Sequence, residues 1–162
     1  MKKAFSHITE EGTVTMVNVE NKVPSQRIAI AQAVVYFNQE TFTLLEENAL
    51  PKGDVLTTAK IAGIMGAKQS STLIPMCHPL ALTYIDIRFT KLPLKYALQI
   101  ESEVHTYGVT GVEIEALLAV QIAAVTVYDM CKAVQKDICI GDCVLIYKSG
   151  GKSGEYRYHN EK

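Results

Sequence analysis

The chain has 162 residues, of which 48% are hydrophobic and 20% charged, and its formal net charge at pH 7 is -1. This length predicts a single domain over residues 1–162 that buries about 70% of the surface of its unfolded chain. A dedicated nucleic-acid-binding protein carries a basic excess, so the balanced charge argues against that class. Any anionic ligand must then be held by local clusters of Lys and Arg.

The termini and the cysteines indicate a cytoplasmic protein. The N-terminus MKKAFSHITEEG lacks the apolar core of a secretory signal, and the longest apolar runs are too short to span a bilayer. We therefore predict no membrane association and reduced cysteines. These are Cys77, Cys131, Cys139 and Cys143. Cys139 and Cys143 with Cys77 and His78 could supply four zinc ligands, but a lone C-x3-C pair is a weak metal signal, and we predict no metal site.

The first elements in the chain are predicted to be strands. Residues 13–19 (TVTMVNV) alternate apolar and polar positions, as a half-buried strand does. Residues 27–37 (RIAIAQAVVYF) are rich in β-branched and aromatic residues and predict a second strand. The first strand is a candidate partner of the second.

Two helices are predicted next. Residues 40–48 form a short helix that ends before Pro51, and Asp54 opens a stronger helix that runs to about Lys68. One face of this second helix carries a stripe of small residues: Ala59, Gly63, Gly66 and Ala67. Such a stripe allows another element to approach closely, even though each interior glycine costs up to about 1 kcal/mol relative to alanine.

A loop and then a β-hairpin are predicted after these helices. Residues 69–79 (QSSTLIPMCHP) contain two prolines and predict a turn-rich loop, the kind of segment on which sites are built. Residues 82–90 and 96–106 alternate, and residues 91–95 form a tight joint between them. This pattern predicts a β-hairpin.

A long helix and a last strand complete the predicted fold. The helix covers residues 112–134, the strand lies near residues 143–147, and a flexible Gly/Lys-rich tail begins at about residue 149. This order of elements implies an α+β fold with helices on one face of a mainly antiparallel sheet.

The end of the long helix combines apolar and charged residues. The helix is apolar on every side as far as Tyr128, and Asp129, Lys132 and Lys136 then follow on one face. A helix that is apolar all round is a buried helix, where an unpaired charge is costly. Two interpretations remain open. The Asp129/Lys132 pair either marks where the helix reaches the surface or forms an acid/base pair in a cleft.

Two loops supply further candidate groups. Lys52 in PKGD lies just ahead of a helix N-terminus, which favours anions. In PMCHP, prolines fix the backbone on both sides of Cys77 and His78, and a histidine can shuttle protons near neutral pH. The alternatives are a solvated lysine and a structural histidine.

Two carboxylates lie at the start of the long helix. Residues 108–115 (GVTGVEIE) lead Glu113 and Glu115 into its first turn, where acidic residues are also common partners of the helix dipole. Fourteen residues at about 1.5 Å each separate Glu115 from Asp129 by about 21 Å. Both can serve one pocket only if a second copy of the chain contributes, so a shared site would lie at a subunit interface.

The segment KSGGKSG, residues 148–154, is similar to the end of a phosphate-binding P-loop. Ile146 stands where the first glycine of that motif must be, so we reject a nucleotide hydrolase. We predict instead a flexible glycine segment whose lysines close over an anionic ligand.

The chain also contains KGDV, TAKIAGIMGAK, LIPMCHPL, TGVEIEAL and TVYDMCKAVQKD. With KSGGKSG, these motifs resemble the cyclic pyranopterin monophosphate synthase family, the molybdenum cofactor biosynthesis protein C family, from about Ser6 to Gly154. The resemblance implies a lyase that converts 3',8-cyclo-7,8-dihydro-GTP into cyclic pyranopterin monophosphate and releases pyrophosphate, with no cofactor. It also implies a ferredoxin-like fold and a homohexamer, a trimer of dimers with the site between subunits.

The resemblance assigns roles to individual residues. Asp129 matches the catalytic aspartate, Lys132 the lysine beside it, and Lys52 the lysine of KGDV. The expected substrate-contacting residues are Met76, Cys77, His78, Glu113, Ile114 and Glu115. Met76 and Ile114 stand where the family often has Leu and Met. The substrate's triphosphate needs local positive charge, and further candidates for this role are Arg27, Lys68, Lys148 and Lys152.

Two other functions remain as alternatives. One is a non-catalytic ferredoxin-like module that binds a small anion and regulates a partner. The other is an enzyme of the same fold that acts on a different nucleotide or on a sugar phosphate. Charged groups on a long apolar helix favour an enzyme over the regulatory module.

Overall fold

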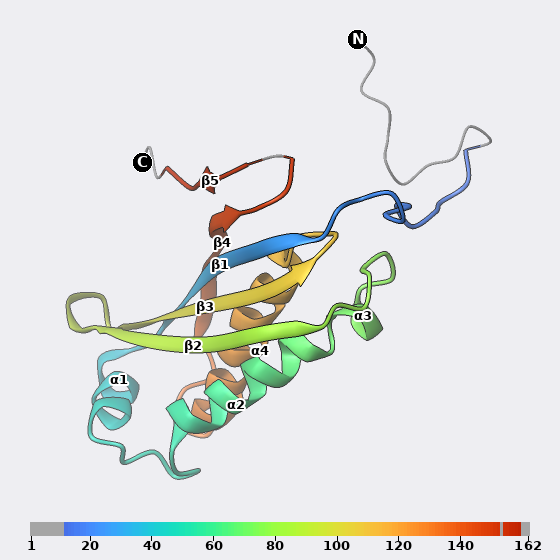
Figure 1. Cartoon of the computed structure of the whole chain (residues 1–162). Helices are drawn as coiled ribbons and strands as arrows, with labels where there is room; N and C mark the ends of the chain where they lie inside the picture. Colours follow the sequence, from blue (N-terminus) through green and yellow to red (C-terminus); the bar gives the residue numbers. More distant parts are fainter. Residues whose placement is uncertain (1–11, 153, 160–162) are drawn as a thin grey trace.

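The computed structural model describes residues 12–152 and 154–159, and a five-stranded antiparallel sheet forms its centre (Figure 1). The strands lie in the order β2-β3-β1-β4-β5. Their bounds are Ser25–Tyr36 for β1, Leu82–Leu92 for β2, Ala97–Gly108 for β3, Cys139–Ser149 for β4 and Tyr156–Arg157 for β5. The predicted α+β architecture with an antiparallel sheet is confirmed, and the arrangement is consistent with a ferredoxin-like fold.

The helices lie mainly on one face of this sheet, with α2 and α4 side by side (Figure 1). Their bounds are Gln39–Glu46 for α1, Val55–Lys68 for α2, Ser70–Leu73 for α3 and Glu113–Cys131 for α4, with a short 3-10 helix at Pro93–Lys95. The side chain of Asp54 accepts a hydrogen bond from the Thr57 backbone N–H at 3.0 Å. This N-cap confirms the predicted start of α2.

The core lies between the sheet and α4. Alternate residues of β1, Ala29, Ala31 and Ala33, are fully buried, as are Ile100 and Val104 on β3. Small alanine side chains on the central strand allow α4 to pack close to the sheet. The start and the end of α4 are thereby fixed relative to the ends of β1, β3 and β4.

Glycines bring α2 and α4 into close contact. A Cβ atom on Gly63 would lie 2.9 Å from the carbonyl oxygen of Ala119, and one on Gly66 would lie 2.8 Å from Cγ1 of Ile122. The predicted small-residue face is confirmed, because its members Ala59, Gly63, Gly66 and Ala67 are all buried.

Burial of α4 differs from the sequence-based expectation. The helix is apolar on every side, but Ile114 and Val125 remain 40% and 55% exposed. By length and composition α4 could cross a membrane, yet half of its most apolar window is buried within the fold, as in the core helix of a globular protein. The expectation of a helix buried all round is wrong, because only the side that faces the sheet and α2 is covered.

The predicted first strand, residues 13–19, is also wrong. Within it only Val14 forms an isolated β-bridge, and Val14 and Met16 are 73% and 45% exposed. Both edges of β1 are already paired, one with β3 and the other with β4, so this segment has no place beside the predicted second strand.

The other predicted elements match the structure with shifted ends. The predicted hairpin is β2 and β3, which pair along their length, and the predicted loop 69–79 contains the single-turn helix α3. The last strand is longer than expected at both ends. The tail, whose flexibility stays a prediction, contributes β5 to the sheet edge. Ser153 and residues 160–162 of the tail lie outside the described residues.

Candidate functional site

Three adjoining clefts surround the N-terminal end of α4. We call them the basic cleft, of about 730 Å³, the central cleft, of about 480 Å³, and the small cleft, of about 250 Å³. The basic and central clefts share Lys22, Thr110, Gly111 and Glu113 in their walls. The central and small clefts share His78, Leu80 and Glu115. Because neighbouring clefts share walls, the three form one continuous groove of a size typical of small-molecule sites.

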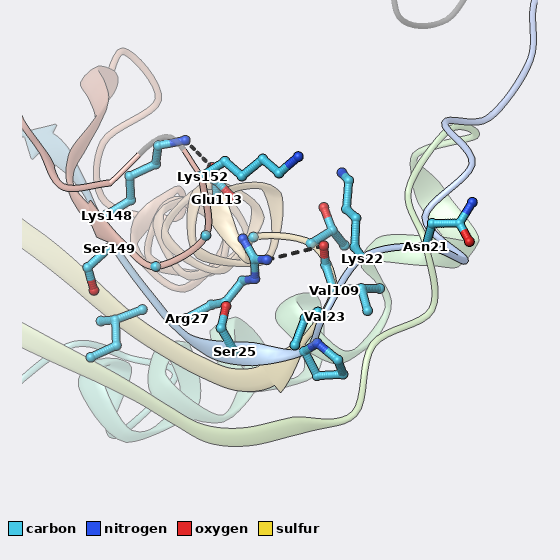
Figure 2. Close-up of a pocket in the computed structure, with 16 residues that line it drawn as sticks. Asn21, Lys22, Val23, Ser25, Arg27, Val109, Glu113, Lys148, Ser149 and Lys152 are labelled. Atoms are coloured by element: carbon cyan, nitrogen blue, oxygen red, sulfur yellow. Dashed lines mark hydrogen bonds and ion pairs between the residues drawn. The ribbon is translucent and has the colours of Figure 1, made fainter.

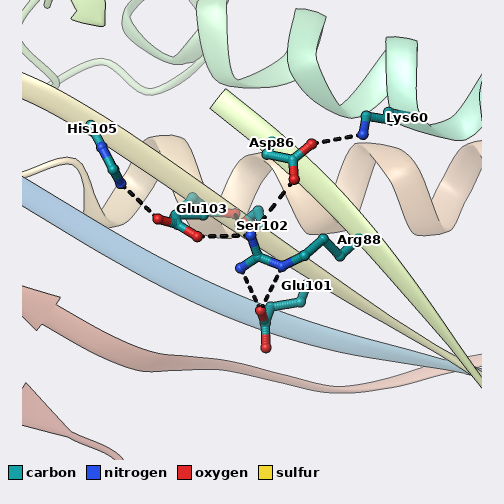
Figure 3. A network of polar contacts seen from close by, with 8 residues as sticks. Lys60, Asp86, Arg88, Glu101, Ser102, Glu103 and His105 are labelled. Atoms are coloured by element: carbon teal, nitrogen blue, oxygen red, sulfur yellow. Dashed lines mark hydrogen bonds and ion pairs between the residues drawn. The ribbon is translucent and has the colours of Figure 1, made fainter. Parts of the chain in front are cut away.

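The basic cleft lies between the start of β1, the loop before α4 and the end of β4. Figure 2 shows four cationic side chains around it, Lys22, Arg27, Lys148 and Lys152, against the single carboxylate of Glu113. This excess of positive charge makes the cleft suited to a polyanionic ligand although the whole chain is nearly neutral.

Hydrogen bonds fix two of these cations. The Arg27 guanidinium donates to the carbonyl oxygens of Gly108 and Val109 at 3.0 and 3.2 Å. The ammonium of Lys148 lies 2.7 Å from a carboxylate oxygen of Glu113, and both side chains are about three-quarters buried. These contacts join β1, β4 and the start of α4 around one cavity.

Glycines close the loop that follows β4. Gly150 and Gly151 have φ angles of 98° and 73°, which other residues rarely adopt. A Cβ on Gly150 would overlap the carbonyl oxygen of Gln26, and one on Gly151 would overlap the Arg27 guanidinium. The KSGG turn can therefore fold over the start of β1 and bring Lys152 to the cleft.

The central cleft contains the predicted substrate-contacting loop. Met76, Cys77 and His78 meet Ile114 and Glu115 of α4 in its wall. The Glu115 side chain is almost fully buried, and this burial, with the nearby Glu113 carboxylate, raises its pKa. Burial and the nearby Glu115 carboxylate likewise raise the pKa of the Cys77 thiol. The cleft thus holds a carboxyl group and a thiol that both favour their neutral forms.

The small cleft lies on the other side of Glu115. Lys68, Ser70 and Ser71 line it together with His78 and Glu115. The predicted phosphate-binding residue Lys68 is therefore at the end of the groove opposite to the basic cleft.

A separate charged cluster lies at the C-terminal end of α4. The Asp129 carboxylate accepts from the ammonium of Lys52 at 2.8 Å and from that of Lys132 at 2.7 Å. The lysines lower the pKa of Asp129 to about 2, and Asp129 in turn raises the pKa of Lys132. Asp129 and Lys132 are each 51% exposed, and none of the three residues lines the three clefts.

The structure therefore brings the predicted site residues together in two groups. Lys52, Asp129 and Lys132 form one group, on the surface at the end of α4. The second group lines the groove: Arg27, Lys68, Met76, Cys77, His78, Glu113, Ile114, Glu115 and Lys148. Within one chain the groups lie about 21 Å apart along the helix, so a single chain does not join them.

Residues 16–151 match the model of the MoaC family. The chain belongs to this family. It is similar to proteins named cyclic pyranopterin monophosphate synthase. The relative from Nitratidesulfovibrio vulgaris (strain Hildenborough) is 62% identical over 156 residues, which cover 96% of this chain and 97% of the relative. The relative from Oleidesulfovibrio alaskensis is 55% identical, covering 97% and 99% of the two chains. That from Staphylococcus carnosus is 50% identical, covering 94% and 96%.

Sequence reasoning missed one cation of the groove in this MoaC-family chain. Lys22 borders both the basic and the central cleft, but it precedes β1 in a segment without regular structure. Lys22 and Lys148 are far apart in the sequence, and the pairing of β1 with β4 brings these two lysines to one cleft. The only local signal is a lysine shortly before the first buried strand.

Potential metal ligands do not form a cluster in the described part of the chain. Among residues 12–152 and 154–159, no three His, Cys, Asp or Glu side chains come together as metal ligands. Cys77, Cys131, Cys139 and Cys143 are free thiols, and Cys139 and Cys143 are exposed.

Proposed function

We propose that this MoaC-family chain is a lyase of molybdenum cofactor biosynthesis, a cyclic pyranopterin monophosphate synthase. It converts 3',8-cyclo-7,8-dihydro-GTP into cyclic pyranopterin monophosphate and releases pyrophosphate. The observation that carries the proposal is a strongly cationic cleft that adjoins a cleft with a buried, protonatable carboxyl group. The names of the relatives support the same activity and favour an enzyme over a regulatory module.

The basic cleft is the proposed site of the substrate's triphosphate. Arg27, Lys148 and Lys152 can each donate charge-assisted hydrogen bonds to phosphate oxygens. The pair between Lys148 and Glu113 holds the lysine in place before the substrate arrives, which reduces the conformational entropy lost on binding.

The central cleft is the proposed site of the ring system. Met76 and Ile114 supply apolar walls, and Glu115 supplies a carboxyl group whose raised pKa keeps it protonated to a higher pH than an exposed one. Opening and closing the rings requires proton transfers, and a neutral carboxyl group next to the ring can donate a proton.

The Asp129 cluster is the proposed second half of the site, contributed by another copy of the chain. Two ammonium groups share one carboxylate, so the cluster offers proton donors and an acceptor within 3 Å of each other. The outer side of α2 and α4 carries three apolar side chains that are each more than half exposed: Ile61, Met65 and Val125. Their exposure supports burial of these helices against another copy of the chain. We propose a homohexamer, a trimer of dimers, as the active assembly.

The direct test is to incubate the purified protein with 3',8-cyclo-7,8-dihydro-GTP. We expect release of pyrophosphate together with a pterin that becomes fluorescent on oxidation. Asp129→Asn should abolish both signals, because an amide cannot accept the proton. If the native protein releases no pyrophosphate, the proposed function is wrong. If Asp129→Asn keeps normal turnover, the proposed role of Asp129 is wrong.

A further inference from the structure

We propose that residues 17–22, which we call the N-terminal strap, form a wall of the substrate groove, and that His78 positions this strap so that Lys22 binds the phosphate nearest to the ring system. The inference rests on the proposed function, because it assigns a new role within the same groove. It makes His78 a positioning residue and Lys22 a further substrate-binding residue.

The strap borders two of the three clefts. Val17 and Val19 line the central cleft, and Lys22 lines both the central and the basic cleft. Figure 2 shows the Lys22 side chain on the side of the basic cleft opposite to Lys148. The strap therefore passes along the groove and ends where the two clefts meet.

The strap has an ordered turn but belongs to no helix or strand. The backbone N–H of Glu20 donates to the Asn18 side chain at 2.9 Å, and that of Lys22 donates to the Val19 carbonyl at 3.0 Å. These local bonds give the strap its shape. They do not hold it against the rest of the protein.

His78 supplies a connection between the strap and the groove. Its Nε2 atom lies 2.9 Å from the carbonyl oxygen of Val17, which can only accept, so Nε2 carries a proton and donates. The histidine itself is held in the proline-flanked loop that lines the central and small clefts. This Nε2 proton is already engaged by the strap, so it does not reach a ligand in the groove without breaking that bond.

The charge of Lys22 is available to a ligand. Lys148 is paired with Glu113 at 2.7 Å, whereas Lys22 forms no ion pair within the described part of the chain. A ligand with phosphates in the basic cleft and rings in the central cleft has its ring-proximal phosphate at the border that Lys22 occupies. Lys22 thus selects ligands that carry a phosphate next to the rings.

Kinetics of matched variants test the role of Lys22. Lys22→Met should raise KM by at least about tenfold, because a hydrogen bond to a charged phosphate contributes about 1.5–3 kcal/mol, or about 10- to 160-fold. Lys95→Met is the control, since Lys95 is an exposed lysine in the β2–β3 turn, away from the groove. Equal KM values for the two variants would overturn the assignment.

Two His78 variants separate positioning from proton transfer. His78→Gln retains a side-chain N–H that can donate to Val17, and His78→Ala does not. A positioning role predicts that Gln recovers most of the kcat/KM that Ala loses. If Gln is as inactive as Ala, His78 acts in the chemistry and the inference fails.

Limited trypsin digestion reports on the strap itself and does not depend on turnover. Cleavage after Lys22 should be several-fold faster in His78→Ala than in the native protein or in His78→Gln, at a temperature where thermal melts show all three folded. Inorganic tripolyphosphate should slow the cleavage in the native protein. Unchanged cleavage in both experiments would overturn the inference. A native protein that lacks activity but shows both effects would instead contradict only the proposed function.

Discussion

The two ends of α4 carry similar residues in opposite environments. At its N-terminal end Glu115 is 4% exposed, and burial raises the pKa of its carboxyl group. At its C-terminal end Asp129 is half exposed, and two lysines lower the pKa of its carboxyl group to about 2. The N-terminal end belongs to a groove whose described walls come from a single chain. The other presents a charged cluster on an open surface.

This difference in burial and charge indicates that the two ends of α4 have different roles. The N-terminal end has the volume and the positive charge to bind a substrate. The C-terminal end has a fixed donor–acceptor cluster but lines none of the three clefts. On the proposed function, the substrate-binding groove and the Asp129 cluster meet only when one chain's groove faces another chain's cluster.

The largest expected effect comes from mixing two inactive variants. Asp129→Asn and Glu115→Gln should each lower kcat at least a hundredfold, the usual contribution of one acid or base. In dimers reassembled at random from the two variants, about a quarter of the sites combine an intact groove with an intact cluster. We expect the mixture to regain about that fraction of native activity. Reassembled mixtures that stay inactive would show that both groups act from one chain.

The next prediction separates binding from chemistry by kinetics. Lys148→Met, at the groove, should raise KM about tenfold or more with a smaller change in kcat. Lys132→Met, at the cluster, should lower kcat about a hundredfold with little change in KM. Steady-state pyrophosphate release measures both constants. If both variants change the same constant, the division between the two ends of α4 is wrong.

A smaller effect is expected from the contact between α2 and α4, which lies between the two ends of α4. In Gly63→Ala the new methyl group meets the backbone oxygen of Ala119, which cannot move alone, so overpacking of about 1–3 kcal/mol exceeds the gain in helix propensity of up to about 1 kcal/mol.

Gly66→Ala is the matched control, because its methyl group meets side-chain atoms of the half-buried Ile122 and no backbone oxygen, and we expect a smaller loss. Urea unfolding at one protein concentration measures the two free energies of unfolding. Equal losses would mean that the backbone contact at Gly63 has no special cost.

The smallest effects are opposite pH dependences of stability. The raised pKa of Glu115 means that its carboxyl group is tolerated when protonated, below its unfolded value near 4.5, and destabilises the fold as pH rises through the folded pKa. Glu115→Gln should therefore gain stability relative to the native protein as the pH rises above about 4.5.

The pH dependence of stability that Asp129 contributes has the opposite sign. Its carboxylate stabilises the fold above the unfolded pKa of 3.8, and this contribution disappears as pH falls through about 2. Asp129→Asn should lose stability relative to the native protein at pH 6 but not at pH 2, by a small amount because the pair is exposed and screened by salt. Thermal melts across pH measure both variants, and slopes of equal sign would contradict the comparison.

Much of the fold follows from local sequence patterns. The alternation in residues 82–90 and 96–106 predicts the hairpin because both strands bury one face against the helices. Asp54 predicts the start of α2 because its carboxylate can accept from exposed N–H groups. The same reasoning fails for residues 13–19, because both edges of β1, the expected partner strand, are already paired with β3 and β4.

The candidate site was only partly predictable for a related reason. Motifs identify Glu115, His78 and Lys148 one by one, but the order β3-β1-β4 of neighbouring strands decides which of them share a cavity. The pairing of β1 with β4 brings Lys22, which precedes β1, to the same cleft as Lys148 of β4. The half exposure of Asp129 depends on where α4 leaves the core, which its uniformly apolar sequence does not indicate.

The glycine contact between α2 and α4 sets the axial register of the two helices. They run antiparallel, since Lys52 just before α2 meets Asp129 at the end of α4, and Lys68 at the end of α2 shares a cleft with Glu115 at the start of α4. Sliding one helix by a single turn, about 5.4 Å, would separate Lys52 from Asp129 and Lys68 from Glu115 together. A single helix–helix register therefore aligns both proposed halves of the site, and a change in that register would disturb both.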